Sequence, residues 1–103
     1  MNVNASIKKV YLNLILKGTK TVEYRDMSEY WTKKLVDVES YKGKTVQEVI
    51  DGLQQGKLTL KARAIDTITF FCEGTRTRYK VLSINVYTGH KLFAIRLGEQ
   101  IGK

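Results

Sequence analysis

The chain has 103 residues, of which 43% are hydrophobic, with no proline and one cysteine. This length predicts a single domain spanning residues 1–103, and one cysteine with one histidine excludes a disulfide framework and a cysteine- or histidine-rich metal site. Eighteen Lys and Arg against ten Asp and Glu give a net charge of +8, which favours polyanionic partners and salt-sensitive binding.

The surplus of positive charge lies toward the two ends of the chain. Residues 1–44 hold nine basic and five acidic side chains, and residues 73–103 hold six and two. The sequence has neither the pattern of a signal peptide nor the ~18 continuous apolar residues of a membrane span. We therefore expect a soluble, cytoplasmic protein that binds neither a membrane, nor a metal ion, nor a cofactor. Its expected partner is a nucleic acid or another phosphate-rich molecule. A basic surface that only confers solubility is the alternative.

The first quarter of the chain predicts a strand, a helix and a second strand. Val3–Ile7 has the mixed character of a short strand, and the apolar residues from Val10 to Leu16 recur at helical spacing. Gly18 is expected to end this helix, because glycine adopts the left-handed conformation at little steric cost. After it, Thr21–Arg25 is rich in β-branched and aromatic residues, which indicates a strand.

Two further helices are predicted from their N-terminal residues. Ser28 is a typical N-cap for a short helix beginning at Glu29. Thr45 and Glu48 form a capping-box pattern, in which the hydroxyl accepts from the third amide and the carboxylate accepts from the cap amide. Apolar residues then follow at i, i+3, i+4 and i+7, so this helix should end near Gly56.

The remainder of the chain predicts strands joined by turns. Leu58–Cys72, Arg78–Tyr87 and Leu92–Leu97 alternate in character, with turns at residues 73–75 and 88–90. The alternation slips at Val81–Leu82, which indicates a bulge or burial on both faces. The order β-α-β-α-α followed by three antiparallel strands predicts an α+β fold, a small mixed or antiparallel β-barrel flanked by two or three helices.

The densest group of polar and aromatic residues is the segment from Gly18 to Arg25. Glu23 and Arg25 should share one face of the strand, where an acceptor and a planar, bidentate donor would suit a phosphate or a base edge. Lys20 would point to the opposite face in a regular strand, whereas on the glycine turn it is free to swing toward Glu23. A partly desolvated lysine can serve as a nucleophile or base. A surface ion pair is the competing interpretation.

Several segments together resemble the ASCH domain, a branch of the PUA-like superfamily. The similarity is to small bacterial and phage members, and its motifs occur in the same order along nearly the whole chain. These motifs are G-x-K-T-x-E-Y-R at 18–25, Tyr30-Trp31 with Leu35, Ile68-Thr69-Phe70, and the closing segment 93–98. The family often has arginine where this chain has Lys34, and an N-G-Y-like turn where it has Cys72-Glu73-Gly74.

This resemblance implies a PUA-like barrel with a cleft lined by the motif and a role in RNA binding. By the resemblance, Lys20, Arg25 and Lys34 would contact phosphate or a base edge, and Glu23 would accept from a base amine. Some ASCH proteins hydrolyse the acetamide of N4-acetylcytidine and others cleave RNA, and both activities are associated with the lysine that Lys20 matches. The amidohydrolase group has threonine where this chain has Glu23, which could act instead as a general base. A protein-interaction accessory factor is a third reading.

The aromatic residues have two interpretations each. Faces on which a base can stack are offered by Tyr11, Tyr24, Tyr30 and Trp31, although a single tryptophan is more often part of a core. Tyr87 and Phe93 are expected in the core.

Three cations alternate along one strand, at Arg76, Arg78 and Lys80. They suit a groove that follows a nucleic-acid backbone, or equally an edge strand protected by charge. Cys72 is expected to be a buried, inert thiol, and His90 to be solvated.

Overall fold

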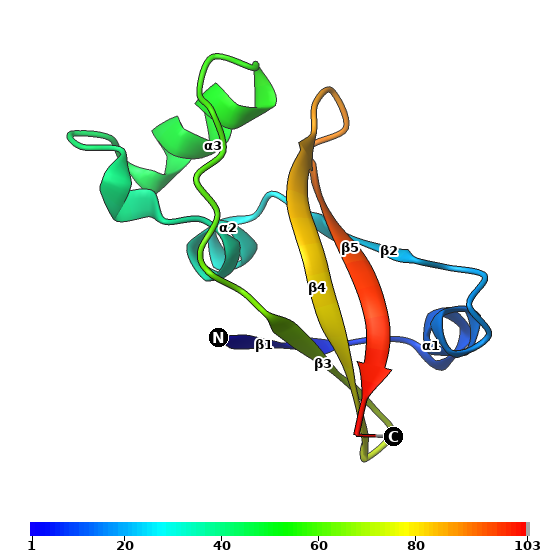
Figure 1. Cartoon of the computed structure of the whole chain (residues 1–103). Helices are drawn as coiled ribbons and strands as arrows, with labels where there is room; N and C mark the ends of the chain where they lie inside the picture. The colour runs from blue at the N-terminus through cyan, green and yellow to red at the C-terminus, as the bar shows by residue number, and fades with distance from the viewer. Residues whose placement is uncertain (103) are drawn as a thin grey trace. The chain divides into compact units, whose positions relative to one another are not determined.

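The structure is a computed structural model that describes residues 1–102. This part of the chain forms an α+β fold with three α-helices, one short 3-10 helix and five strands (Figure 1). In chain order the elements are β1 (Asn2–Ser6), α1 (Lys9–Leu16), β2 (Val22–Asp26), α2 (Glu29–Leu35), η1 (Val38–Ser40), α3 (Val46–Gln54), β3 (Thr67–Cys72), β4 (Thr75–Tyr87) and β5 (Leu92–Ile101). The predicted order of strands and helices is confirmed.

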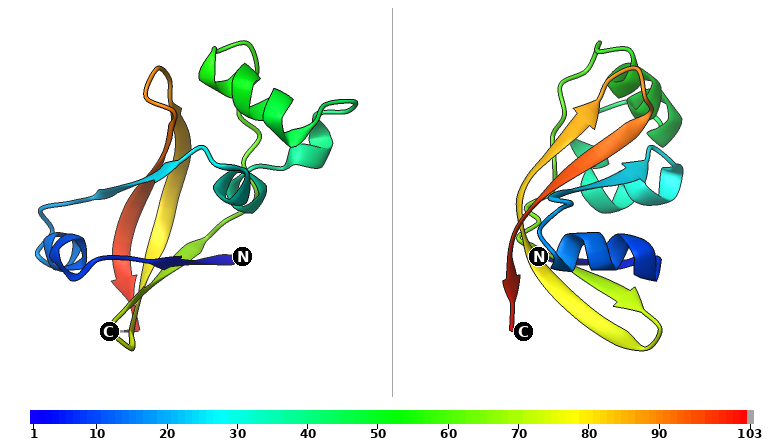
Figure 2. Two further views of the ribbon diagram at one scale, coloured as in Figure 1. Left: turned by 180° about the vertical axis from the view of Figure 1, so that it is seen from behind. Right: turned by 90° about the vertical axis from the view of Figure 1, so that its right-hand side faces the viewer.

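The five strands of the described residues belong to one sheet, in the order β1-β3-β4-β5-β2. β1 runs parallel to β3, with Val3 opposite Ile68, and β3 runs antiparallel to β4. The connection between β3 and β4 is a tight turn in which Glu73 and Gly74 have φ angles of 50° and 81° (Figure 2). Positive φ at both central residues matches the twist of the flanking strands, so this turn closes a regular hairpin.

The described chain divides into two compact units, each with its own apolar core. Unit 1 comprises Met1–Glu23, Ile65–Ser83 and the described residues from Arg96 onward, and unit 2 comprises Tyr24–Ala64 and Ile84–Ile95. The core of unit 1 includes Val3, Ala5, Leu12, Ile15, Ile68, Phe70, Cys72, Tyr79 and Leu97. The core of unit 2 includes Met27, Trp31, Leu35, Val36, Tyr41, Val49, Ile50, Leu53, Phe93 and Ile95.

The helix caps form as the sequence predicts. Ser28 accepts a hydrogen bond from the Trp31 amide at the start of α2. At α3, Thr45 Oγ1 accepts from the Glu48 amide at 3.1 Å, and the Glu48 carboxylate accepts from the Thr45 amide at 2.8 Å. Both halves of the capping box therefore satisfy amides that a helix N-terminus leaves without an intrahelical partner.

The predicted strand boundaries need three corrections. β3 occupies only residues 67–72, because residues 58–64 make no ladder beyond one bridge between Val36 and Ala62. β4 begins earlier, at Thr75, and β5 continues to Ile101. Burial on both faces at Val81–Leu82 is wrong, since Leu82 is 59% exposed. The alternation instead changes at Ser83 and Ile84, which are both half-buried.

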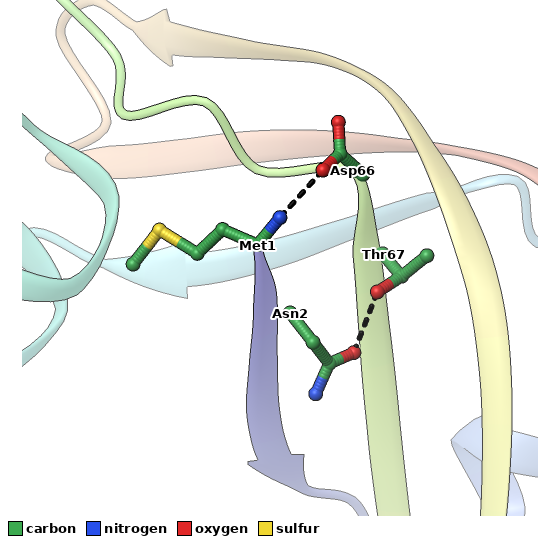
Figure 3. A network of polar contacts seen from close by, with 4 residues as sticks. All are labelled: Met1, Asn2, Asp66 and Thr67. Atoms are coloured by element: carbon green, nitrogen blue, oxygen red, sulfur yellow. Dashed lines mark hydrogen bonds and ion pairs between the residues drawn. The ribbon is translucent and has the colours of Figure 1, made fainter.

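Polar contacts fix the start of β1 beside β3. The α-amino group of Met1 pairs with the Asp66 carboxylate, and the Thr67 hydroxyl donates to Asn2 Oδ1 at 2.8 Å (Figure 3). These contacts set the register in which Asn2 lies opposite Thr67.

Across residues 1–102, helices fall short of the length and apolar character that crossing a membrane requires.

Candidate functional site

The C-terminal end of α1 places Lys20. Gly18 follows the helix with φ of 77°, its amide donates to the carbonyl of Ile15, and the Thr19 amide donates to that of Leu14. This pair of bonds is the Schellman motif, which reverses the chain direction at the end of a helix. The Lys20 amide also donates to the Leu14 carbonyl, at 3.1 Å. The backbone of the motif lysine is therefore anchored to α1.

The side chain of Lys20 turns toward the first residues of β2. Its ammonium group donates to the Val22 carbonyl at 2.6 Å and lies 3.3 Å from the Glu23 carboxylate. The two charged side chains are only 20% and 8% exposed, so they form a partly buried ion pair rather than a solvated one. Because β2 begins at Val22, Lys20 precedes the regular strand. Its side chain therefore takes the second of the two predicted orientations, in which it turns toward Glu23.

Lys20 also lines a hollow of about 240 Å³ in unit 1. The other lining residues come from the end of α1 and from β4 and β5, and are Ile15, Leu16, Gly18, Thr21, Tyr79, Leu97, Gly98 and Gln100. The volume lies just below the ~300–1,000 Å³ of typical ligand pockets, so it suits a small chemical group. Burial raises the pKa of the Tyr79 hydroxyl, which therefore remains a neutral donor and acceptor in this wall.

Sequence reasoning missed Tyr79 and Gln100 as neighbours of Lys20. Both are more than fifty positions away along the chain, and the pairing of the closing strands brings them to the hollow. The only sequence signal was the alternation of β4, which puts Tyr79 on the opposite face from Arg78 and Lys80.

In unit 2, cations lie over the aromatic rings of α2. The Arg25 guanidinium is 5.1 Å from the centre of the Trp31 ring, and the Lys34 ammonium is 5.3 Å from that of Tyr30. Tyr30 and Trp31 meet edge to face at 5.5 Å. Trp31 is buried, which confirms the core interpretation, whereas Tyr30 is 58% exposed and presents its ring to solvent.

A second group of rings joins β2 to the β4–β5 turn within unit 2. Tyr24 stacks on Tyr87 with 5.8 Å between ring centres, and His90 lies 4.3 Å from Tyr87. The expectation that Tyr87 belongs to the core is wrong, because this residue is 45% exposed. Tyr87 is the last residue of β4 and lies next to the turn that leads to β5. Phe93, by contrast, is fully buried as expected.

The residues of the motif fall into two groups. Lys20 and Glu23 belong to unit 1, and the second group, in unit 2, consists of Tyr24, Arg25, Tyr30, Trp31 and Lys34. Within each group the side chains contact one another as described above, except that Tyr24 stacks on Tyr87. A single hollow shared by Lys20 and Arg25 stays a prediction. Cys72 is buried, as expected.

Comparison of the chain with protein-family models, with curated proteins and with solved structures finds no match. Within residues 1–102, no group of three or more His, Cys, Asp or Glu side chains is arranged to hold a metal ion.

Proposed function

We propose that this protein binds RNA or nucleotides, and that its sheet and helices form a small barrel of the PUA-like type found in ASCH domains. The observation that carries the proposal is the arrangement on α2, where the exposed ring of Tyr30 contacts both the Lys34 ammonium and the Trp31 ring. Exposed aromatic rings combined with cations are the usual means by which proteins hold unpaired bases.

The electrostatics of unit 2 support the same proposal. A base that stacks on Tyr30 would bring its phosphate within reach of Lys34, and the guanidinium of Arg25 is a planar donor for a phosphate or a base edge. The chain carries a net charge of +8, which raises the local concentration of any polyanion.

Substitution of Tyr30 tests the proposal. Its ring is exposed, so Tyr30→Ala should fold normally, and the lost stacking should weaken binding of a labelled single-stranded RNA about 5- to 150-fold, that is by ~1–3 kcal/mol. Tyr30→Phe should retain binding because it keeps the ring. Tyr11→Ala, which removes an exposed tyrosine from α1, is the matched control and should bind like the wild type. Unchanged affinity in Tyr30→Ala would contradict the proposal.

A second candidate function is hydrolysis of an acylated nucleoside, favoured by the Lys20–Glu23 pair beside the hollow. In this reaction water adds to the acyl carbon while Glu23 accepts a proton from the water. The C–N bond then breaks as Glu23 returns that proton to the leaving nucleoside amine, which releases the carboxylic acid and the amine. Incubation with acylated cytidines tests it. Product that forms with the wild type and not with Lys20→Met supports hydrolysis, whereas absence of product with the wild type argues for binding alone.

A further inference from the structure

One face of β1, β3 and the first half of β4 in unit 1 carries polar and basic side chains and one aromatic ring. The register of the strands sets its side chains in three cross-strand rows, in which each residue of β3 has a partner on both sides. The rows are Asn2–Thr67–Lys80, Asn4–Thr69–Arg78 and Ser6–Phe71–Arg76, and we call these nine residues the β1–β3–β4 face. The opposite face of the same strands is buried in the core of unit 1.

The charge of this face is of one sign. Its three cations, Arg76, Arg78 and Lys80, are exposed, and its other six residues carry no carboxylate. Charges on a strand often serve to protect a sheet edge from association. That explanation does not apply to β4, which lies between β3 and β5 in the strand order. The alternating cations therefore need another explanation than the protection of an edge.

A chain of hydrogen bonds holds Arg78 in place. Its Nε donates to Thr69 Oγ1 at 3.3 Å, and the Thr69 hydroxyl donates to Asn2 Oδ1 at 3.1 Å. Asn2 Oδ1 also accepts from Thr67, as Figure 3 shows, and its Nδ2 donates to Asn4 at 3.0 Å. Within the described chain the guanidinium bonds through Nε alone, so its two Nη groups remain for a ligand. A guanidinium positioned in this way binds phosphate oxygens with little loss of side-chain entropy.

The neighbouring cations differ in how they are held. The Arg76 guanidinium lies 5.4 Å from the centre of the Phe71 ring, which is a cation–π contact. Lys80 instead pairs with Glu99 of β5 at 3.0 Å, which partly neutralises it. Arg76 and Arg78 are therefore the two cations that the surface both orients and leaves available.

We propose that the β1–β3–β4 face binds the backbone of single-stranded RNA, with Arg76 and Arg78 each engaging one phosphate. The inference rests on the proposed function and adds a second surface to it. Alternate residues on a strand are ~6.6–6.8 Å apart, a spacing that matches consecutive phosphates of an extended single strand. A base can also stack on an arginine guanidinium such as that of Arg76.

The salt dependence of binding tests this proposal. For single strands, log K falls with log[salt] with a slope of about −0.7 for each phosphate contact. The double variant Arg76→Gln/Arg78→Gln should therefore reduce the magnitude of the slope by about 1.4 and weaken binding of a labelled twelve-residue RNA on the order of tenfold at low salt. Lys42→Gln/Lys57→Gln, which removes two exposed lysines of unit 2, is the control with the same net charge.

The outcomes separate this inference from the proposed function. A reduced slope in the arginine variant alone, with unchanged affinity for a mononucleotide, supports it. A wild-type slope in the arginine variant, or an equal reduction in the lysine control, overturns it while RNA binding through α2 stands. Equal affinity for duplex RNA overturns the assignment of this face to single strands. Absence of RNA binding by the wild type overturns both proposals.

Discussion

The ammonium group of Lys20 lies 3.3 Å from the carboxylate of Glu23, and the same ammonium donates to the Val22 carbonyl at 2.6 Å. The pair joins the end of α1 to the beginning of β2, and both side chains are largely shielded from solvent. A lysine in this position has a structural role as well as the ligand-binding role proposed for it, and the two can be separated.

A double-mutant cycle measures the structural part. Lys20→Met should destabilise the protein because the Glu23 carboxylate, which is nearly buried, loses this ammonium. The same substitution should cost less in a Glu23→Gln background, with a coupling free energy of about 1–3 kcal/mol in urea denaturation. Additive effects of the two substitutions would show that the pair contributes nothing to stability.

Gly18→Ala should destabilise the protein through the backbone alone. No heavy atom lies within 4 Å of the position of an added Cβ, but φ of 77° is strained for alanine, at a cost of about 1–2 kcal/mol. Gly18→Asn should lose less, since asparagine tolerates the left-handed region. Thermal unfolding compares the three proteins. Equal melting temperatures for Gly18→Ala and the wild type would argue against the Schellman turn.

The capping box predicts a specific dependence of stability on pH. Hydrogen bonds from Thr45 lower the pKa of Glu48, so its contribution is complete above the unfolded pKa of ~4.3 and is lost as the pH falls through the lower, folded value. The difference in unfolding free energy between wild type and Glu48→Gln should therefore be largest near neutral pH and shrink in acid. Glu39→Gln controls for the loss of one exposed negative charge. A difference that stays constant with pH would contradict this account.

Tyr79 predicts a loss of stability in alkali. Burial raises its pKa, so the unfolded chain releases the phenolic proton first, and stability that is complete below about pH 10 is lost as the pH rises through the folded pKa. Denaturation of wild type and Tyr79→Phe between about pH 8 and pH 11 measures this effect. The variant should show the smaller alkaline decline; identical declines would mean that Tyr79 is solvated.

Local signals in the sequence predicted much of the fold. Gly18, Ser28 and the Thr45–Glu48 box act within one turn of a helix, so their geometry follows from neighbouring residues and is found as expected. The extra length of β4 and β5 was missed because cross-strand partners, rather than the residue types themselves, decide where a ladder ends. Residues 58–64 failed as a strand for the same reason, since they find only one bridge.

The candidate site, like the fold, was predictable only where its residues lie close together in the sequence. The spacing of Lys20 and Glu23 indicated that they could meet, because both lie in one short segment. Tyr79 and Gln100 reach the hollow through strand pairing over long separations, for which one sequence carries no direct signal. The exposure of Tyr87 was misjudged because an aromatic residue type favours burial, whereas this residue ends β4 beside a turn.

The affinity of the wild-type protein for a labelled single-stranded RNA, measured by fluorescence anisotropy at ~50 mM and ~200 mM salt, tests the central claim most directly. We expect saturable binding at the lower concentration and a marked loss of affinity at the higher one, as cations that neutralise phosphates require. Absence of binding to both RNA and mononucleotides at ~50 mM salt would contradict the proposed function.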